Sequence, residues 1–99
     1  MTQPNQQQNQ MQLKADDAIL RGAYANNMQV AHTKEEFVMD FMNMFPPVAT
    51  LNARVIVSPG HMKRMLAALV ENVKRYEEVH GTIEAATSPA DSEMGFKTM

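Results

Sequence analysis

The most strongly patterned segment of this sequence is residues 58–80, which predict one long amphipathic helix. Ser58 is a favoured residue at a helix N-cap, and Pro59 follows at the first helical position, where its missing N–H is no loss. Gly81 suits the left-handed conformation in which many helices end. Such a helix is about 33 Å long. The apolar side chains that share one face at helical spacing are Met62, Met65, Leu66, Leu69, Val73 and Tyr76.

Two shorter segments ahead of the helix have the pattern of strands. Residues 53–57 (Ala-Arg-Val-Ile-Val) are rich in β-branched side chains and predict a short strand that continues directly into the helix. Residues 24–32 alternate between apolar and polar side chains, which is typical of a half-buried strand. The apolar positions of that alternation are Tyr24, Met28 and Val30. Residues 15–21 are ambiguous and could lead into this strand.

The segment Phe37–Phe45 fits a strand and a helix equally well on periodicity. As a strand it has apolar residues on both faces, because successive side chains alternate between the two. As a helix it would begin with a capping box made by Thr33 and Glu36. Residues 33–36 would also suit a hairpin connection. Pro46-Pro47 ends either element.

The two ends of the chain differ in composition from its middle. Residues 1–12 are almost entirely Gln and Asn, and residues 83–99 contain mostly small, polar and acidic residues, so we expect two disordered tails. Residues 13–82 form one predicted domain. Because a domain of this size buries a low fraction of its surface, we expect it to associate with itself or with a partner.

The composition excludes several classes of chemistry and predicts a compartment. The chain has no cysteine, which excludes disulfides, zinc–thiolate sites and thiol catalysis. A net charge of −2 makes direct nucleic-acid binding an unfavoured function. The first twelve residues lack the basic and apolar regions of a secretory signal, and we expect no membrane-spanning segment and a cytoplasmic protein.

Several stretches of the chain together resemble a small bacterial and archaeal family catalogued as a domain of unknown function. They are residues 22–26 (GAYAN), 32–41 (HTKEEFVMDF) and 54–64 (RVIVSPGHMKR), together with Leu69, Asn72, Val73, Arg75, Tyr76 and Glu77. The sequence departs from the family pattern at Pro46-Pro47, where relatives more often have Pro-Gly. The resemblance implies strands followed by a long helix, and it favours the strand for Phe37–Phe45.

The fold that follows is of the α+β class. We expect an antiparallel β-meander of three to four strands and one long C-terminal amphipathic helix packed on one face of that sheet. This order of elements is loosely similar to the subunit of the export chaperone SecB, an analogy of fold alone. Some relatives of the resembled family look like neighbours of the genes for the large RNA polymerase subunits, which implies the transcription machinery as a partner.

The residues suited to chemistry are scattered. The three histidines are too dispersed for a metal motif, so we expect no metal, no cofactor and no enzymatic activity. Asp40 is expected to point outward near Arg54 or a cation of the helix. Lys63 and Arg64, close to the free N–H groups of the helix start, are candidate contacts for an anion or an acidic partner. A solvated helix face is the alternative explanation for both.

The sequence most favours a non-enzymatic interaction module that forms a homo-oligomer. The helix can cover one face of Phe37–Phe45, and the other would then be an exposed apolar surface of the kind that marks interfaces. The residues of that candidate partner surface are Val38, Met42 and Met44. An accessory factor of RNA polymerase is the specific form of this hypothesis. The alternatives are an oligomeric holdase-like chaperone and, third, a small enzyme.

Overall fold

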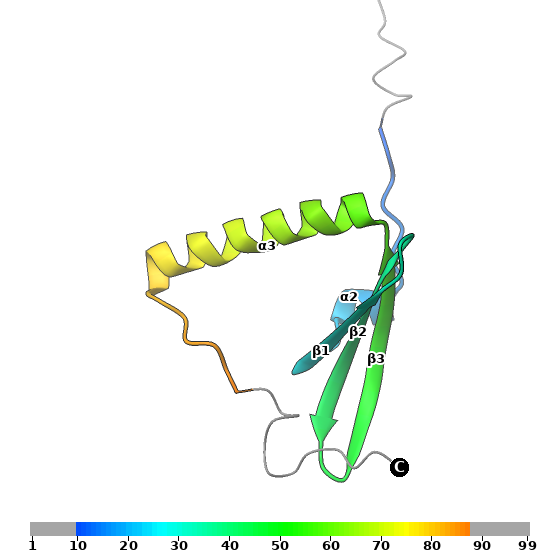
Figure 1. Ribbon diagram of the computed structural model, residues 1–99, viewed down its shortest axis with the longest axis horizontal. Helices are drawn as coiled ribbons and strands as arrows, with labels where there is room; N and C mark the ends of the chain where they lie inside the picture. Colours follow the sequence, from blue (N-terminus) through cyan, green and yellow to red (C-terminus); the bar gives the residue numbers. More distant parts are fainter. Residues whose placement is uncertain (1–9, 88–99) are drawn as a thin grey trace, which may run out of the picture.

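The structure is a computed structural model that describes residues 10–87. Its elements are α2 (Asp17–Arg21), β1 (Asn27–His32), β2 (Phe37–Phe45), β3 (Val48–Val57) and α3 (Pro59–His80). The strands form one antiparallel sheet in the order β1-β2-β3 (Figure 1). The predicted α+β fold, a meander followed by a long C-terminal helix, is therefore confirmed, and the sheet has three strands within the described residues.

The segment that fitted both a strand and a helix is the central strand β2. Thr33 begins the turn that joins it to β1, with its N–H donating to the Glu36 carbonyl at 2.9 Å. The Thr33 Oγ1 accepts hydrogen bonds from the backbone N–H groups of Glu35 and Glu36 at 3.2 and 3.3 Å. Thr33 thus closes a hairpin rather than capping a helix. Pairing on both sides then determines the strand conformation of Phe37–Phe45.

The last strand is longer than predicted. Residues 46 and 47 form the turn after β2, and β3 starts at Val48, whereas the sequence pattern predicted a strand over residues 53–57 only. Val48 pairs with Phe45, so the hairpin extends the ladder through residues of weak strand preference such as Ala49. The register between β2 and β3 shifts after the pair of Phe41 with Ala53, which leaves Asn52 as the extra residue of a β-bulge.

The segment before β1 is held against the sheet by two asparagine side chains. The Asn26 amide donates to the Met44 carbonyl at 3.1 Å, and the Asn26 Oδ1 accepts from the Met44 N–H at 2.8 Å. The Asn26 side chain thus makes the two hydrogen bonds to β2 that the backbone of a paired strand residue would make, just before the start of β1. Asn52 in the bulge donates its side-chain N–H to the carbonyl of Tyr24. The ambiguous residues 15–21 contain the short helix α2 rather than a strand.

The sheet has two chemically different faces, which the register defines. One, the apolar face, has the aligned positions Val30, Met39 and Val55 at its centre, and it also includes Met28, His32, Phe37, Phe41, Ala53 and Val57. The other, the ion-pair face, has Gln29, Asp40 and Arg54 aligned at its centre. Met39 on the apolar face is 4% exposed and Met44 on the ion-pair face is 5% exposed. These are the buried apolar side chains of the described residues.

The structure differs from expectation in the position of α3, which does not lie across its own sheet. None of the 22 residues of α3 is buried, and Figure 1 shows the helix projecting away from the end of the sheet. The short connection causes this position of α3, because Ser58 alone separates the last residue of β3 from the first residue of α3. Connections between a strand and a helix that packs back on it commonly have two to six residues. One residue directs the helix away instead.

Both predicted ends of α3 are confirmed. Ser58 is the N-cap, and its hydroxyl accepts a hydrogen bond from the His61 N–H at 3.1 Å. Gly81 is the C-cap, with φ at 93°, and its N–H donates to the Glu77 carbonyl at 3.0 Å. The tails predicted at residues 1–12 and 83–99 lie outside the described residues at positions 1–9 and 88–99. The described parts of both tails contain no helix or strand.

Candidate functional site

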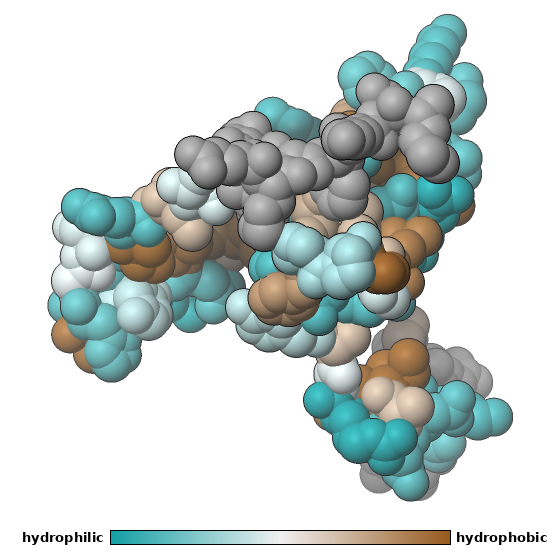
Figure 2. Space-filling model, turned by 90° about the horizontal axis from the view of Figure 1, so that it is seen from below, coloured by the Kyte–Doolittle hydropathy of each residue, from teal (hydrophilic) through white to brown (hydrophobic). Residues whose placement is uncertain are grey.

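One unusual surface in the described part of the chain is the apolar stripe of α3. We define this stripe by the residues Met62, Met65, Leu66, Leu69, Val73 and Tyr76. Met62 and Met65, in the first two turns beside the sheet, are half-buried. The other four are exposed, and Leu69 reaches 61%. Apolar side chains along most of a 22-residue helix therefore contact solvent in the single chain, and Figure 2 shows brown, apolar residues along α3 between hydrophilic ones.

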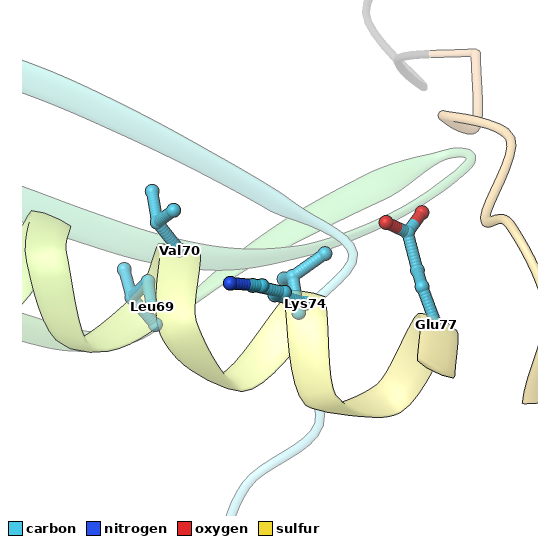
Figure 3. Close-up of a pocket in the computed structure, with 5 residues that line it drawn as sticks. Leu69, Val70, Lys74 and Glu77 are labelled. Carbon is cyan, nitrogen blue, oxygen red and sulfur yellow. The ribbon is translucent and has the colours of Figure 1, made fainter. Parts of the chain in front are cut away.

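The middle of the stripe lines a shallow hollow (Figure 3). Its volume is about 360 Å³, and its lining residues all belong to α3: Leu69, Val70, Val73, Lys74 and Glu77. Because a single helix lines it, the hollow has one wall and no opposite side. Lys74 and Glu77 give it a charged edge beside an apolar floor. Such a surface suits the side chains of another protein element better than a small ligand, which needs an enclosed cleft.

The apolar face of the sheet is also incompletely covered. Met28, Val30 and Val55 on this face are exposed by two-fifths to one-half of their surface, and they surround the buried Met39. His32 and Phe37 lie at one end of the face, with their ring centroids 5.3 Å apart. The single chain thus exposes apolar side chains on α3 and on the apolar face of the sheet, and the ion-pair face also exposes Leu51 and Ile56.

The ion-pair face shows how Asp40 is used. Asp40 pairs in register with Arg54 on β3, and the two side chains form a bidentate ion pair. Arg54 Nε donates to one carboxylate oxygen at 2.7 Å, and its Nη2 donates to the other at 2.8 Å. These hydrogen bonds hold the pKa of the Asp40 carboxyl below its usual value. The prediction that Asp40 points outward near Arg54 is confirmed, and such a carboxylate suits structural pairing rather than acid catalysis.

The candidate partner surface Val38, Met42 and Met44 lies on the same ion-pair face of β2. Val38 and Met42 are half-buried, so both keep some contact with solvent. Met44 is buried, and its expected exposure is wrong, since the Asn26 side chain brings the segment before β1 against this end of β2. A role of Val38 and Met42 in binding a partner stays a prediction.

The candidate anion contacts Lys63 and Arg64 lie in the first turns of α3, where both are exposed. The Arg64 Nη2 lies 2.8 Å from the His61 Nδ1, so this cation has a hydrogen-bonding partner inside the helix start. The N–H of His61 is bonded to the Ser58 hydroxyl. The sequence Ser58-Pro59-Gly60-His61 thereby forms a capped helix start, and its use as an anion site stays a prediction.

The rest of the described residues add no chemical centre. Between residues 10 and 87, no three His, Cys, Asp or Glu side chains lie close enough together to hold a metal ion. Among the helices of this part of the chain, none has the length and apolar character needed to cross a membrane. The candidate functional site among the described residues is the exposed apolar stripe of α3.

Comparison with known proteins identifies the family. The chain belongs to the family described as "Protein of unknown function (DUF3467)", whose sequence model matches residues 1–85. This range contains all the strands and helices of the described chain, and it confirms the resemblance to an uncharacterised family. No curated protein and no solved structure matches the chain.

Proposed function

We propose that this chain is a protein–protein interaction module that binds through the apolar stripe of α3. One observation supports this proposal above the others, which is the exposure of Leu66, Leu69, Val73 and Tyr76 along one side of a single helix. Monomeric proteins rarely expose a continuous apolar surface of this kind, and such surfaces mark binding sites for other proteins. Amphipathic helices commonly bind through residues at this spacing. Recognition rather than catalysis is the proposed activity.

The test is an affinity purification of the full chain from its own cells in three forms. Leu69→Asp puts a charge in the middle of the apolar stripe, whereas Ala67→Asp puts the same charge on the opposite side of the same helix. We expect the wild-type chain and Ala67→Asp to retain the same proteins, the chain itself included, and Leu69→Asp to lose them. Identical sets of retained proteins from all three forms would exclude the stripe as the binding surface.

The same experiment addresses the more specific roles. The family resemblance supports an accessory factor of RNA polymerase, and subunits of the polymerase retained in fixed proportion would agree with that role. A holdase-like chaperone is the second candidate, because the exposed methionine and branched side chains of the sheet and α3 would accept varied apolar segments. A chaperone would retain many unrelated unfolded proteins, and it would suppress the heat aggregation of a model client.

A further inference from the structure

The two exposed apolar surfaces of this chain fit each other in chemistry. The stripe of α3 and the apolar face of the sheet are both composed of aliphatic, methionine and aromatic side chains, with charged residues outside them. The ion-pair face is different, because Gln29, Asp40 and Arg54 lie across its centre and divide its exposed apolar residues, Leu51 and Ile56. A helix that covers the sheet would therefore lie on the apolar face, where it buries no ion pair.

The surfaces also match in width. With 22 residues α3 is about 33 Å long, and helices with their side chains are about 10 Å wide. The nine residues of β2 span about 30 Å, and three strands spaced about 4.8 Å apart give a face about 10–14 Å wide. The face is as wide as one helix, and its apolar positions on β2, from Phe37 to Phe41, cover about 13 Å of the length of α3.

The helix and the sheet of one chain are not brought together by the link between them. Ser58 is the single linking residue, and its extended backbone (φ −70°, ψ 156°) sends α3 away from the sheet. Short links of this kind favour the exchange of an element between copies, because the element reaches a neighbour without a reversal of the chain. The apolar face of a second copy is not subject to this restriction, because no one-residue link joins it to the helix that would cover it.

The area favours a mutual exchange over a single contact. One helix on one sheet face covers a strip of roughly 330 Å² on each surface. A single contact therefore removes about 660 Å² in total, which is below the roughly 1,200 Å² of stable interfaces. Two symmetric contacts bury about 1,300 Å² and reach that range. In a two-fold dimer, each copy contributes its helix and its sheet equally.

We propose that the partner of the stripe is a second copy of this chain, with α3 of each protomer lying on the apolar face of the other protomer's sheet. This inference rests on the proposed function, since it names the protein that the α3 stripe binds. It assigns Leu69 and Val73 to the centre of the contact from the helix, and Val30 and Val55 to its centre from the sheet. The dimer then surrounds Met39, which is already buried, with apolar atoms from the second chain.

Cysteine cross-linking can test this arrangement without background, because the natural chain has no cysteine. A tagged chain with Leu69→Cys and an untagged chain with Val55→Cys are unfolded together, refolded, and treated with a short bismaleimide. The expected product is a cross-linked pair of one tagged and one untagged chain. A matched control replaces Leu69→Cys with Ala67→Cys, on the opposite side of α3, and we expect about tenfold less of the mixed product because the effective concentration there is low.

Three results would overturn the proposed exchange. A chain with both Leu69→Cys and Val55→Cys that links only within itself would show that α3 packs on its own sheet. Pairs of Leu69→Cys chains that form in excess over the mixed pair would show helix-on-helix contact. Sedimentation of the full wild-type chain as a monomer at high concentration would exclude a second copy altogether. Loss of other proteins with Leu69→Asp in the affinity purification would still support the proposed function in each of these cases.

A complementation experiment tests the same geometry without cross-linking. Leu69→Asp damages the helix surface and Val30→Asp damages the sheet surface, so each variant alone has two damaged contacts in its dimer. A mixed dimer keeps one contact between an intact helix and an intact sheet. We expect each variant alone to sediment as a monomer and the mixture to form a weaker dimer at concentrations above those that the wild type needs, because one contact buries about half of the wild-type area. No dimer in the mixture, with both chains folded by circular dichroism, would contradict the exchange.

Discussion

The sheet and α3 differ in how many of their apolar side chains are buried within one chain. The sheet pairs several of its polar groups inside the chain, through the turn at Thr33, the Asn26 side chain on Met44 and the ion pair of Asp40 with Arg54, and it leaves the buried Asn43 Oδ1 without a partner among the described residues. The ends of α3 are likewise capped, yet its apolar stripe remains in solvent. Within one chain the sheet buries Met39 and Met44, whereas no residue of α3 is buried. The difference indicates which region depends on a second surface.

The largest expected effect is on the sheet, where Met39 is buried. Met39→Ala removes a buried side chain from the central strand and leaves a cavity, which lowers the free energy of unfolding by about 2–5 kcal/mol. Urea unfolding followed by circular dichroism measures the loss. The matched control is Met28→Ala on the same face, where the side chain is half exposed and the loss is smaller. Equal losses at both positions would mean that Met39 is not the centre of the core.

The next largest effect is expected at α3, where the stability should depend on protein concentration, unlike the effect of Met39→Ala in the sheet. Leu69→Ala removes exposed carbon atoms, worth about 2 kcal/mol per protomer when the stripe is covered by a partner. We expect the unfolding midpoint of the wild-type chain to rise with protein concentration, and that of Leu69→Ala to rise less. Met39→Ala should lower the midpoint at every concentration. A wild-type midpoint independent of concentration would contradict a self-associating α3.

Substitution of Asn26 in the sheet is expected to have an intermediate effect on stability. Asn26→Ala leaves the N–H and carbonyl of Met44 without their partners, which costs about 1–3 kcal/mol. Asn26→Asp keeps the acceptor for the Met44 N–H but loses the donor, so we expect an intermediate loss. Asn27→Ala, one residue along, is the control. Amide hydrogen exchange at Met44 should speed up in Asn26→Ala, and unchanged exchange would show that the bond contributes no protection.

A smaller effect is expected at the start of α3. Ser58→Ala removes the hydroxyl that accepts from the His61 N–H and lowers stability by about 0.5–2 kcal/mol, as at other helix N-caps. Ser58→Asp retains an acceptor and should restore most of the loss. Helix content by circular dichroism measures both variants. If Ser58→Asp is no better than Ser58→Ala, the residue acts through its backbone link rather than through its side chain.

The smallest expected effect is the pH dependence of the ion pair, because its arginine is largely in solvent. Arg54 lowers the pKa of Asp40 in the folded state, so the charged carboxylate stabilises the fold. That contribution is present above the unfolded-state pKa, near 3.9, and is lost as the pH falls through the lower folded-state pKa. The stability difference between wild type and Asp40→Asn should therefore be constant above about pH 5 and shrink below about pH 4. A difference that grows on acidification would contradict the assigned pairing.

The parts of the fold that the sequence predicts are those with local signals. The bounds of α3 follow from Ser58-Pro59 and Gly81, because the residues that cap a helix act within one turn of its ends. Phe37–Phe45 remained ambiguous because its apolar residues fit periods of 2 and 3.6 alike. Pairing with β1 and β3, which is not local, selects the strand. The early start of β3 was missed for the same reason.

The candidate site was predicted less well than the fold. The stripe of α3 is plain in the sequence, yet an amphipathic pattern states only that a helix needs a partner, not which surface or chain provides it. The choice of Val38, Met42 and Met44 assumed that α3 covers the other face of β2. The role of Asn26 had one signal, its place in the stretch 22–26 that resembles the family. A single sequence does not reveal that this amide bonds to the backbone of Met44.

The order of the elements along the chain has a consequence for synthesis. All three strands precede α3, and neighbouring strands pair through short turns, so the sheet can form within microseconds of leaving the ribosome. At about 5–20 residues per second, the 22 residues of α3 take roughly another 1–4 s to be made. During that interval the apolar face of a nascent chain has no helix of its own. A completed second copy already has one, and under the proposed exchange that helix is the one that covers the new sheet.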